Sequence, residues 1–158
     1  GETMADREDS LFAIRDLHKR YGHIQEVIVQ NLCPKPGTPL ERQPVPTTDE
    51  ICATIRMGKD ILQPDIAIQI PPNLIDAASL IDCGVDDLGG VSPLTIDYVN
   101  PEHPWPAFDE LRAIAGTAVL RERLCIYPQY IERGWYDAGL QPLINRLSQI
   151  VQDRNGIP

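Results

Sequence analysis

The residues best suited to chemistry are two adjacent carboxylates, Asp86 and Asp87, followed closely by Gly89 and Gly90. Consecutive residues of a strand face opposite sides, so only one carboxylate can point toward a ligand. The pair is therefore not an acid–base dyad, and the sequence leaves open which aspartate faces the ligand. The inward one could hydrogen-bond a substrate N–H or O–H group or accept a proton. Its structural alternative is a salt bridge to a neighbouring loop.

Two other predicted strands also end in polar side chains. Gln30 and Asn31 close the first strand, Gln69 and Asn73 follow the second, and Ser92 comes after the aspartate pair. The carboxyl ends of parallel strands in an α/β barrel converge on one mouth, where ligands bind. Each amide could instead cap its strand and bond loop backbone. Because all three strands end alike, the pattern favours a site.

The elements that position these residues alternate between strand and helix. We predict helices over about 6–21, 48–62, 74–82, 107–117 and 141–152, and strands over about 24–31, 65–70 and 85–88. In the second strand, Ile66, Ile68 and Ile70 alternate with Ala67 and Gln69, which predicts one face under helices and one toward a ligand. The order predicts a parallel sheet in an α/β fold, and we expect residues 1–158 to form one domain.

Composition narrows the function classes. The net charge is −9 and no Lys/Arg cluster occurs, which argues against nucleic acid and anionic membranes as partners. No apolar run approaches the roughly 20 residues of a membrane-spanning helix, and the first residues lack a signal-peptide pattern. We expect a cytoplasmic protein.

The four cysteines are widely spaced and form no CxxC pair: Cys33, Cys52, Cys83 and Cys125. Metal knuckles and iron–sulfur loops need closely spaced thiols, so we expect no metal ligands in this chain. The simplest interpretation is that all four are reduced and mostly buried.

Several long segments resemble a known family. They are GET at 1–3, YGHIQEVIVQN at 21–31, PKPGTP at 34–39, IQIPPNL at 68–74, GVDDLGGVSP at 84–93 and DYVNPEHPWP at 97–106. Together they resemble the later part of radical S-adenosylmethionine (SAM) enzymes, and specifically the deazaflavin (FO) synthase subunit that closes the deazaflavin ring. The resemblance covers nearly the whole chain.

The resemblance implies a TIM-like (βα) barrel that uses SAM and a [4Fe–4S] cluster. In that family a 5′-deoxyadenosyl radical acts on a hydroxybenzyl–diaminouracil adduct, and cyclisation with loss of ammonia gives the precursor of coenzyme F-420. The family's CxxxCxxC cluster motif is absent here. The chain therefore resembles the C-terminal half of the barrel, carrying strands six to eight and extra helices from about 107 to 158. We expect it to be inactive without the N-terminal half.

The resemblance also implies roles for individual residues. Glu2, Gln30 and Asn31 would line the SAM side, whereas the substrate side would carry Gln69, Asn73, Asp86, Asp87, Ser92 and Thr95. The inward aspartate would orient or deprotonate the substrate. The family usually has Phe-Arg where this chain has Leu32-Cys33, so an arginine contact there is in doubt and Cys33 is not taken as a cluster ligand. A partner transferase subunit is also implied.

The sequence is also compatible with other functions. The chain could belong to a sister radical SAM enzyme, either the adduct-forming transferase or a menaquinone-pathway relative. It could instead be a non-catalytic half-barrel that binds a ligand or a partner. An aldolase-type barrel is disfavoured because no lysine closes a predicted strand. A half-barrel has open strand edges, so we expect the isolated chain to self-associate.

Overall fold

The computed structural model describes residues 2–92 and 94–156, which form two compact units, Gly1–Gly116 and Thr117–Pro158. Four residues lie outside the described ones. Two of them, Gly1 and Pro93, belong to the segments that carry the family resemblance, and the other two, 157–158, belong to the expected helical extension. The stretch 118–127, near the start of the second unit, contains no helix or strand. The expectation of a single domain over residues 1–158 stays a prediction.

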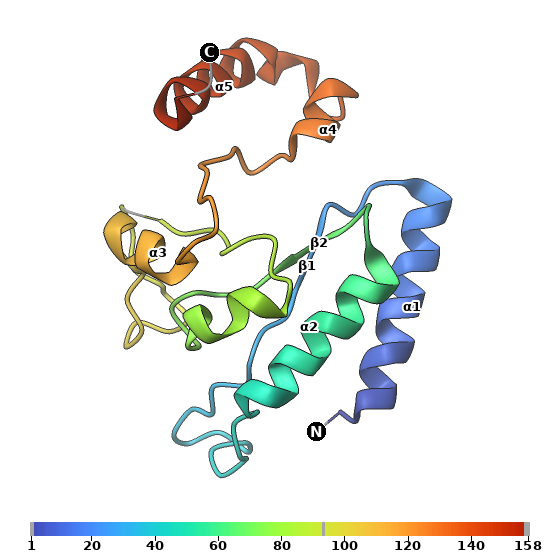
Figure 1. The fold of residues 1–158 in the computed structure, drawn as a ribbon, viewed down its shortest axis with the longest axis vertical. Coiled ribbons are helices and arrows are strands. Elements are labelled where there is room, and N and C mark those ends of the chain that lie inside the picture. Colours follow the sequence, from blue (N-terminus) through green and yellow to red (C-terminus); the bar gives the residue numbers. More distant parts are fainter. Residues whose placement is uncertain (1, 93, 157–158) are drawn as a thin grey trace. The chain divides into compact units, whose positions relative to one another are not determined.

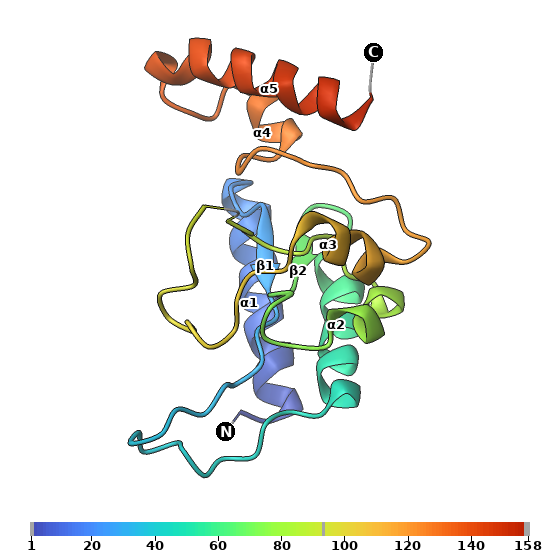
Figure 2. The same ribbon diagram turned by 90° about the vertical axis from the view of Figure 1, so that its left-hand side faces the viewer.

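The first unit contains a parallel sheet covered by two helices (Figures 1 and 2). Its elements in chain order are α1 (Met4–Tyr21), β1 (Glu26–Ile28), α2 (Thr48–Leu62), β2 (Ala67–Gln69), the 3-10 helix η1 (Ala77–Cys83) and α3 (Phe108–Ala115). Strand β1 pairs with β2 in parallel, and a parallel bridge joins Gln69 to Asp87. The predicted parallel α/β arrangement is confirmed, although the structure shows no closed barrel.

The strands are shorter than predicted, and the third is reduced to that bridge. Backbone bonds nevertheless extend the pairing, because Val29 N donates to Gln69 O (2.9 Å) and Ile70 N donates to Asp87 O (3.1 Å). Prolines follow soon after both strands and supply no N–H group to a ladder, so the pairing stops there. The three segments therefore still run side by side in the predicted order.

Helices α1 and α2 begin and end at residues that the sequence marks clearly. Thr3 caps α1 by accepting the Asp6 N–H, and Gly22 ends it in the left-handed conformation at φ 66°. Thr47 caps α2 by accepting the Glu50 N–H. Both helices run side by side, and the Arg7 guanidinium donates to Thr54 Oγ1 at 2.9 Å between them.

The core lies between these helices and one face of the sheet. Ile66, Ile68 and Ile70 are essentially inaccessible to solvent, as their alternation predicts, and Ile55 of α2 is fully buried against them. A Cβ at Gly58 would lie 2.8 Å from the Ile68 side chain, so the glycine lets α2 approach the sheet closely. This packing leaves the opposite face of the sheet open.

Two predicted helices differ in the structure. The segment predicted as a helix at 74–82 is the 3-10 helix η1, and Asp76, not Asn73, precedes its first residue. The Asn73 amide instead bonds a distant loop, so it is not available as a cap. Helix α3 is somewhat shorter than the predicted 107–117 because Gly116 ends it.

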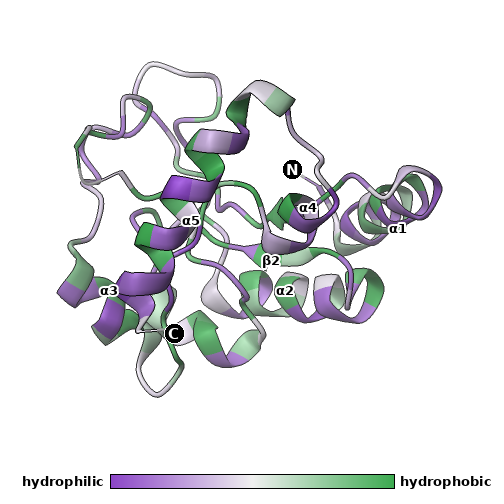
Figure 3. Cartoon of the chain, turned by 90° about the horizontal axis from the view of Figure 1, so that it is seen from above, coloured by the Kyte–Doolittle hydropathy of each residue, from purple (hydrophilic) through white to green (hydrophobic). Residues whose placement is uncertain are grey.

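The second unit consists of α4 (Pro128–Glu132), the 3-10 helix η2 (Ala138–Leu140) and α5 (Gln141–Asn155). Helix α5 confirms the predicted closing helix, and Figure 3 shows hydrophilic and hydrophobic residues alternating along it. Only Ile144 of its apolar residues is fully buried. Among the described residues, no helix combines the length and apolar character needed to cross a membrane.

Cys52 and Cys83 form a disulfide between α2 and η1. This finding corrects the expectation that all four cysteines are reduced and mostly buried. The two residues are 31 positions apart, and only the packing of η1 against α2 brings them together. The other two cysteines do not take part in this disulfide: Cys33 is half-buried and Cys125 is exposed.

Candidate functional site

The candidate site lies on the open face of the sheet, at the carboxyl ends of the strands. The register pairs Ile28 with Gln69, and the bridge pairs Gln69 with Asp87, so these three side chains share one face. Glu26 lies on the same face, two residues before Ile28. Ile28 is 52% exposed despite its place in the sheet, whereas the Gln69 side chain is buried.

The Gln69 amide connects β1 to the turn after Asp87. With the amide oriented to satisfy its neighbours, its nitrogen donates to both Glu26 carboxylate oxygens at 3.0 Å, and its oxygen accepts the Gly90 N–H at 3.3 Å. Gly89 has φ +80°, and a Cβ there would lie 2.6 Å from the Gln69 side-chain amide. Only glycine therefore fits this turn, whose path depends on Gln69 and Glu26.

The two aspartates have different surroundings, as strand geometry requires. Asp86 faces α2: one carboxylate oxygen pairs with Lys59 Nζ at 2.5 Å, and the other accepts the Ile68 N–H (2.9 Å) and the Gln63 amide (3.2 Å). Asp87 lies on the Gln69 side, where its Oδ1 accepts the Gly89 N–H at 2.8 Å. Asp87 therefore shares the face of Gln69, whereas Asp86 points toward the helices and pairs with Lys59 of α2.

Asn31 lies at the end of the segment that follows β1. Its Nδ2 donates to the Leu74 carbonyl oxygen at 2.9 Å and to Cys33 Sγ at 3.4 Å, which ties this end to the loop after β2. Its Oδ1 is buried and has no hydrogen-bond partner. A buried acceptor of this kind is costly unless another group bonds it. The neighbouring Gln30 is exposed.

Asn73 holds the loop that follows the third segment. Its Nδ2 donates to Asp97 Oδ2 and to the His103 carbonyl oxygen, both at 3.0 Å, while its Oδ1 is buried without a partner. Asp97 also accepts the Asn100 N–H at 3.0 Å, and mainly this bond lowers the Asp97 pKa to about 2. A Lys35–Glu102 ion pair joins this loop to the one after β1.

The two hydroxyl residues predicted to contact substrate lie together in this third loop. Thr95 donates through both its N–H (3.1 Å) and its Oγ1 (2.7 Å) to Ser92 Oγ. Both residues line a groove of about 440 Å³ whose other walls include Trp105 and Phe108. The structure thus places Ser92 and Thr95 beside a cavity that could hold a small molecule.

Glu2, expected on the SAM side, precedes α1 and is exposed. It pairs with Arg7 Nε at 3.2 Å. The amino ends of α1 and α2 lie at the same end of the unit as the loop after β1 (Figure 1). The Glu2 carboxylate contacts the helix that follows it.

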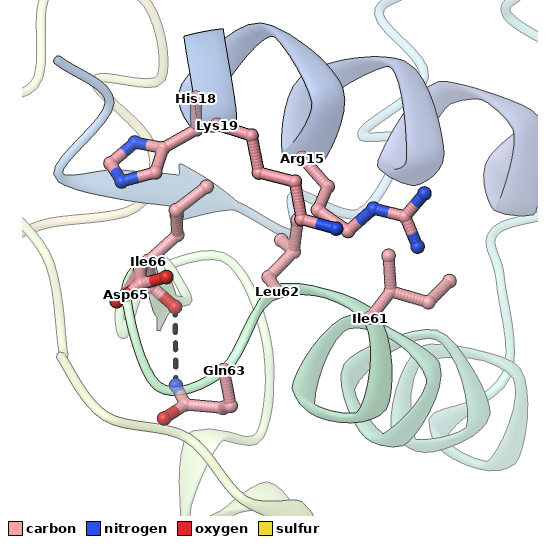
Figure 4. Close-up of a pocket in the computed structure, with 8 residues that line it drawn as sticks. All are labelled: Arg15, His18, Lys19, Ile61, Leu62, Gln63, Asp65 and Ile66. Atoms are coloured by element: carbon pink, nitrogen blue, oxygen red, sulfur yellow. Dashed lines mark hydrogen bonds between the residues drawn. The ribbon is translucent and has the colours of Figure 1, made fainter. Parts of the chain in front are cut away.

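A second, smaller pocket of about 210 Å³ lies between the end of α1 and the connection from α2 to β2 (Figure 4). The Gln63 amide in its wall donates to the Ile66 carbonyl oxygen at 3.1 Å. His18 Nδ1 accepts the Ile24 N–H at 3.1 Å. This pocket therefore lies at the amino end of β2. In parallel α/β folds, ligands bind at the carboxyl ends of the strands.

No group of three His, Cys, Asp or Glu side chains within residues 2–92 and 94–156 could hold a metal ion. Two of the four cysteines are bonded to each other, and Cys33 and Cys125 belong to different units. The donor set of the described residues therefore does not fit an iron–sulfur cluster.

Comparison with known proteins identifies the relatives of this chain. A protein of Methanoregula boonei named 7,8-didemethyl-8-hydroxy-5-deazariboflavin synthase is 65% identical over 158 residues, which is 100% of this chain and 48% of the relative. A protein of the same name from Methanoculleus marisnigri is 70% identical over 149 residues, 94% of this chain and 45% of the relative. This chain is a homologue of those synthases.

The homology extends beyond these two organisms and covers only part of each relative. The synthase of Archaeoglobus fulgidus is 47% identical over 150 residues, 94% of this chain and 46% of that protein. The chain thus spans about half the length of the curated relatives it matches. No family model and no solved structure matches the chain.

Sequence reasoning missed two residues that organise the site. Glu26 is not among the predicted site residues, and nothing in the sequence indicates that it holds the Gln69 amide. Asp97 is not among them either, although it accepts four hydrogen bonds, two from Asn100, one from Asn73 and one from Val99. The Asp-x-x-Asn spacing was the one available signal, since an aspartate often accepts backbone N–H groups two or three residues later.

Proposed function

We propose that this chain is the C-terminal part of a 7,8-didemethyl-8-hydroxy-5-deazariboflavin synthase, a radical SAM lyase that makes the precursor of coenzyme F-420. Identity of 65% over all 158 residues to a protein of that name carries the proposal. The geometry supports it, because Gln69 and Asp87 meet on one open face at the carboxyl ends of parallel strands. In this proposal the three segments are the sixth to eighth strands of a (βα) barrel.

Asp87 is proposed as the residue that orients or deprotonates the substrate. It lies on the open face, while Asp86 is engaged by Lys59 and Gln63 on the helix side. Glu26 and Gln69 act as positioning residues, because they determine the path of the Gly89–Gly90 turn beside Asp87. Ser92 and Thr95 would contact the substrate from the groove.

SAM and a [4Fe–4S] cluster would supply the radical. The cluster does not fit the described donors of this chain, so its ligands belong to the rest of the barrel. For SAM, the Asn31 Oδ1 offers a buried, unpaired acceptor for an ammonium or hydroxyl donor. Gln30 is exposed beside it, and Glu2 would have to exchange its Arg7 contact to bind a ligand.

The proposal includes partners. The open sheet face and the buried but unpaired amide oxygens of Asn31 and Asn73 would be completed by the N-terminal half of the barrel and by the small-molecule substrate. A partner transferase subunit would deliver the adduct. We place the enzyme in the cytoplasm, where its cofactors and substrates would be made.

Co-expression with the N-terminal portion of the Methanoregula boonei relative tests the proposal. The purified complex, supplied anaerobically with SAM, a reductant and the hydroxybenzyl–diaminouracil adduct, should form the fluorescent deazaflavin, and the chain alone should not. The same complex is also supplied with the adduct's precursors in place of the adduct. Consumption of the precursors, without cyclisation of the adduct in the first assay, would instead indicate the sister transferase. A complex that assembles and has neither activity would support a non-catalytic module.

A further inference from the structure

The groove beside Ser92 and Thr95 has walls that suit one class of ligand. It lies between the loop after the third segment and the first turns of α3, and its volume of about 440 Å³ is in the range of small-molecule sites. Most of its lining is apolar and two of its side chains are aromatic. The main apolar contributors are Val91, Ile96, Pro101, Trp105, Phe108 and Leu111.

Interactions within the protein already shape this groove. Asn73 bonds Asp97 and the His103 carbonyl oxygen, and Asn100 is buried against the same aspartate, so the loop is held to the end of β2. Trp105 lies between Pro104 and Pro106, which restrict its backbone. A pre-formed wall loses little conformational entropy when a ligand binds, and this favours affinity.

The polar groups of the groove are few. Ser92 and Thr95 supply hydroxyls, and Glu110 supplies a carboxylate whose Oε2 also accepts the Ala107 N–H at 2.6 Å. Aromatic walls with a few hydrogen-bonding groups suit a flat ring that carries hydroxyl substituents. A long aliphatic chain would leave these polar groups unpaired.

We propose that this groove binds the planar, hydroxylated ring of the deazariboflavin, with Trp105 and Phe108 packing on the ring. The inference rests on the proposed function, because the relatives' name supplies the ligand. Asn73 ties the loop that forms the groove to the end of β2, and the lining begins at Val91, directly after the Gly89–Gly90 turn that bonds Asp87. Trp105 and Phe108 are thus specificity residues outside the strand ends.

The binding test titrates the complete 158-residue chain into purified deazariboflavin and follows the anisotropy of the ligand's own fluorescence. Trp105→Ala should weaken binding about tenfold, the loss typical of one stacking contact. Phe108→Ala should weaken it about threefold to tenfold. Phe108 is 58% exposed, so this variant removes little from the core. Trp105→Phe keeps a ring and should stay within about threefold of the unsubstituted chain.

Trp135→Ala is the matched control, because it removes the other tryptophan of the chain, and this one lies outside the groove. It should leave the dissociation constant unchanged, and thermal unfolding of each variant shows whether it folds. The inference is overturned if the Trp105→Ala and Phe108→Ala variants bind the ligand as tightly as the unsubstituted chain does. It is also overturned if the unsubstituted chain does not bind the ligand. The proposed function is tested separately: product formation by the co-expressed complex can succeed while these variants bind normally, and it can fail while the groove still binds the ring.

Discussion

At the residue scale, substitutions of Asp86 and Asp87 should affect product formation and stability differently. In the co-expressed complex, Asp87→Asn should lower deazaflavin formation at least about 100-fold, the usual cost of losing a general acid or base. Asp86→Asn should leave product formation within a few-fold and lower the free energy of unfolding by about 1–2 kcal/mol, because it loses the ion pair with Lys59. Activity assays and urea titrations of both variants provide the measurements.

The outcome that contradicts this assignment is the reverse order, with Asp86→Asn inactive and Asp87→Asn active. Lys59→Met serves as the control. This substitution removes the ion pair of Lys59 with Asp86 and leaves both aspartates in the sequence. It should therefore reproduce the stability loss of Asp86→Asn while deazaflavin formation is retained.

Asp97 makes a prediction about pH. Its pKa in the folded chain is about 2, against an ordinary value of 3.8, mainly because its carboxylate accepts the Asn100 N–H. A group with a lowered folded pKa stabilises the fold above its unfolded pKa, and this contribution disappears as the pH falls through the folded value. The stability difference between the unsubstituted chain and Asp97→Ala should be constant near neutral pH and shrink between about pH 4 and pH 2.

Thermal unfolding at a series of pH values measures this difference. Asp109→Ala is the control. Asp109 is an exposed aspartate that pairs with Arg112 one turn later in α3, so its removal should change the melting temperature little at any pH. A difference between Asp97→Ala and the unsubstituted chain that stays constant down to pH 2 would contradict the role given to Asp97.

At the element scale, the alternation of apolar and polar residues predicted more than any single motif. The face carrying Ile66, Ile68 and Ile70 is buried under α2, because burying such a surface is the main driving force for placing a helix there. The same alternation put Gln69 on the open face. Which aspartate faces inward could not be predicted, because it depends on the pairing of Gln69 with Asp87 across segments distant in sequence.

Other elements were not predictable for a related reason. The 3-10 form of η1 and the disulfide of Cys83 both depend on how closely this segment packs against α2. A pair of cysteines separated by 31 residues carries no signal in the sequence, because many spacings are equally compatible with free thiols. The short helix α4 lies in a stretch whose only local signal is Pro128 at its first position.

The disulfide makes a prediction of its own. A cross-link that closes a loop of this length stabilises a protein by about 3–4 kcal/mol, largely by restricting the unfolded chain. Adding a dithiol reductant should therefore lower the midpoint of urea unfolding, and a Cys52→Ala/Cys83→Ala variant should have the lower midpoint with or without reductant. The Cys33→Ala/Cys125→Ala variant should respond to reductant as the unsubstituted chain does. An unsubstituted chain that is insensitive to reductant would contradict a stabilising cross-link.

At the scale of the whole molecule, the open face of the sheet is the feature that a longer protein would cover. Ile28, the last residue of β1, is 52% exposed on this face, and within residues 2–92 and 94–156 no strand pairs with the free edge of β1. Exposed apolar surface and unpaired strand edges promote association. The relatives, of which this chain spans about half, have the remaining length to provide a cover.

We therefore expect the isolated chain to self-associate and the co-expressed complex not to. Ile28→Lys places a charge on the open face and should weaken self-association about tenfold or more, because the charge would have to be desolvated at the interface. Val45→Lys is the matched control, since Val45 is similarly exposed, at 58%, but belongs to the loop after β1. Sedimentation velocity over a range of concentrations measures both. If the unsubstituted chain is a monomer at every concentration, or if the two lysine variants behave alike, the open face is not the surface that a second half-barrel would cover.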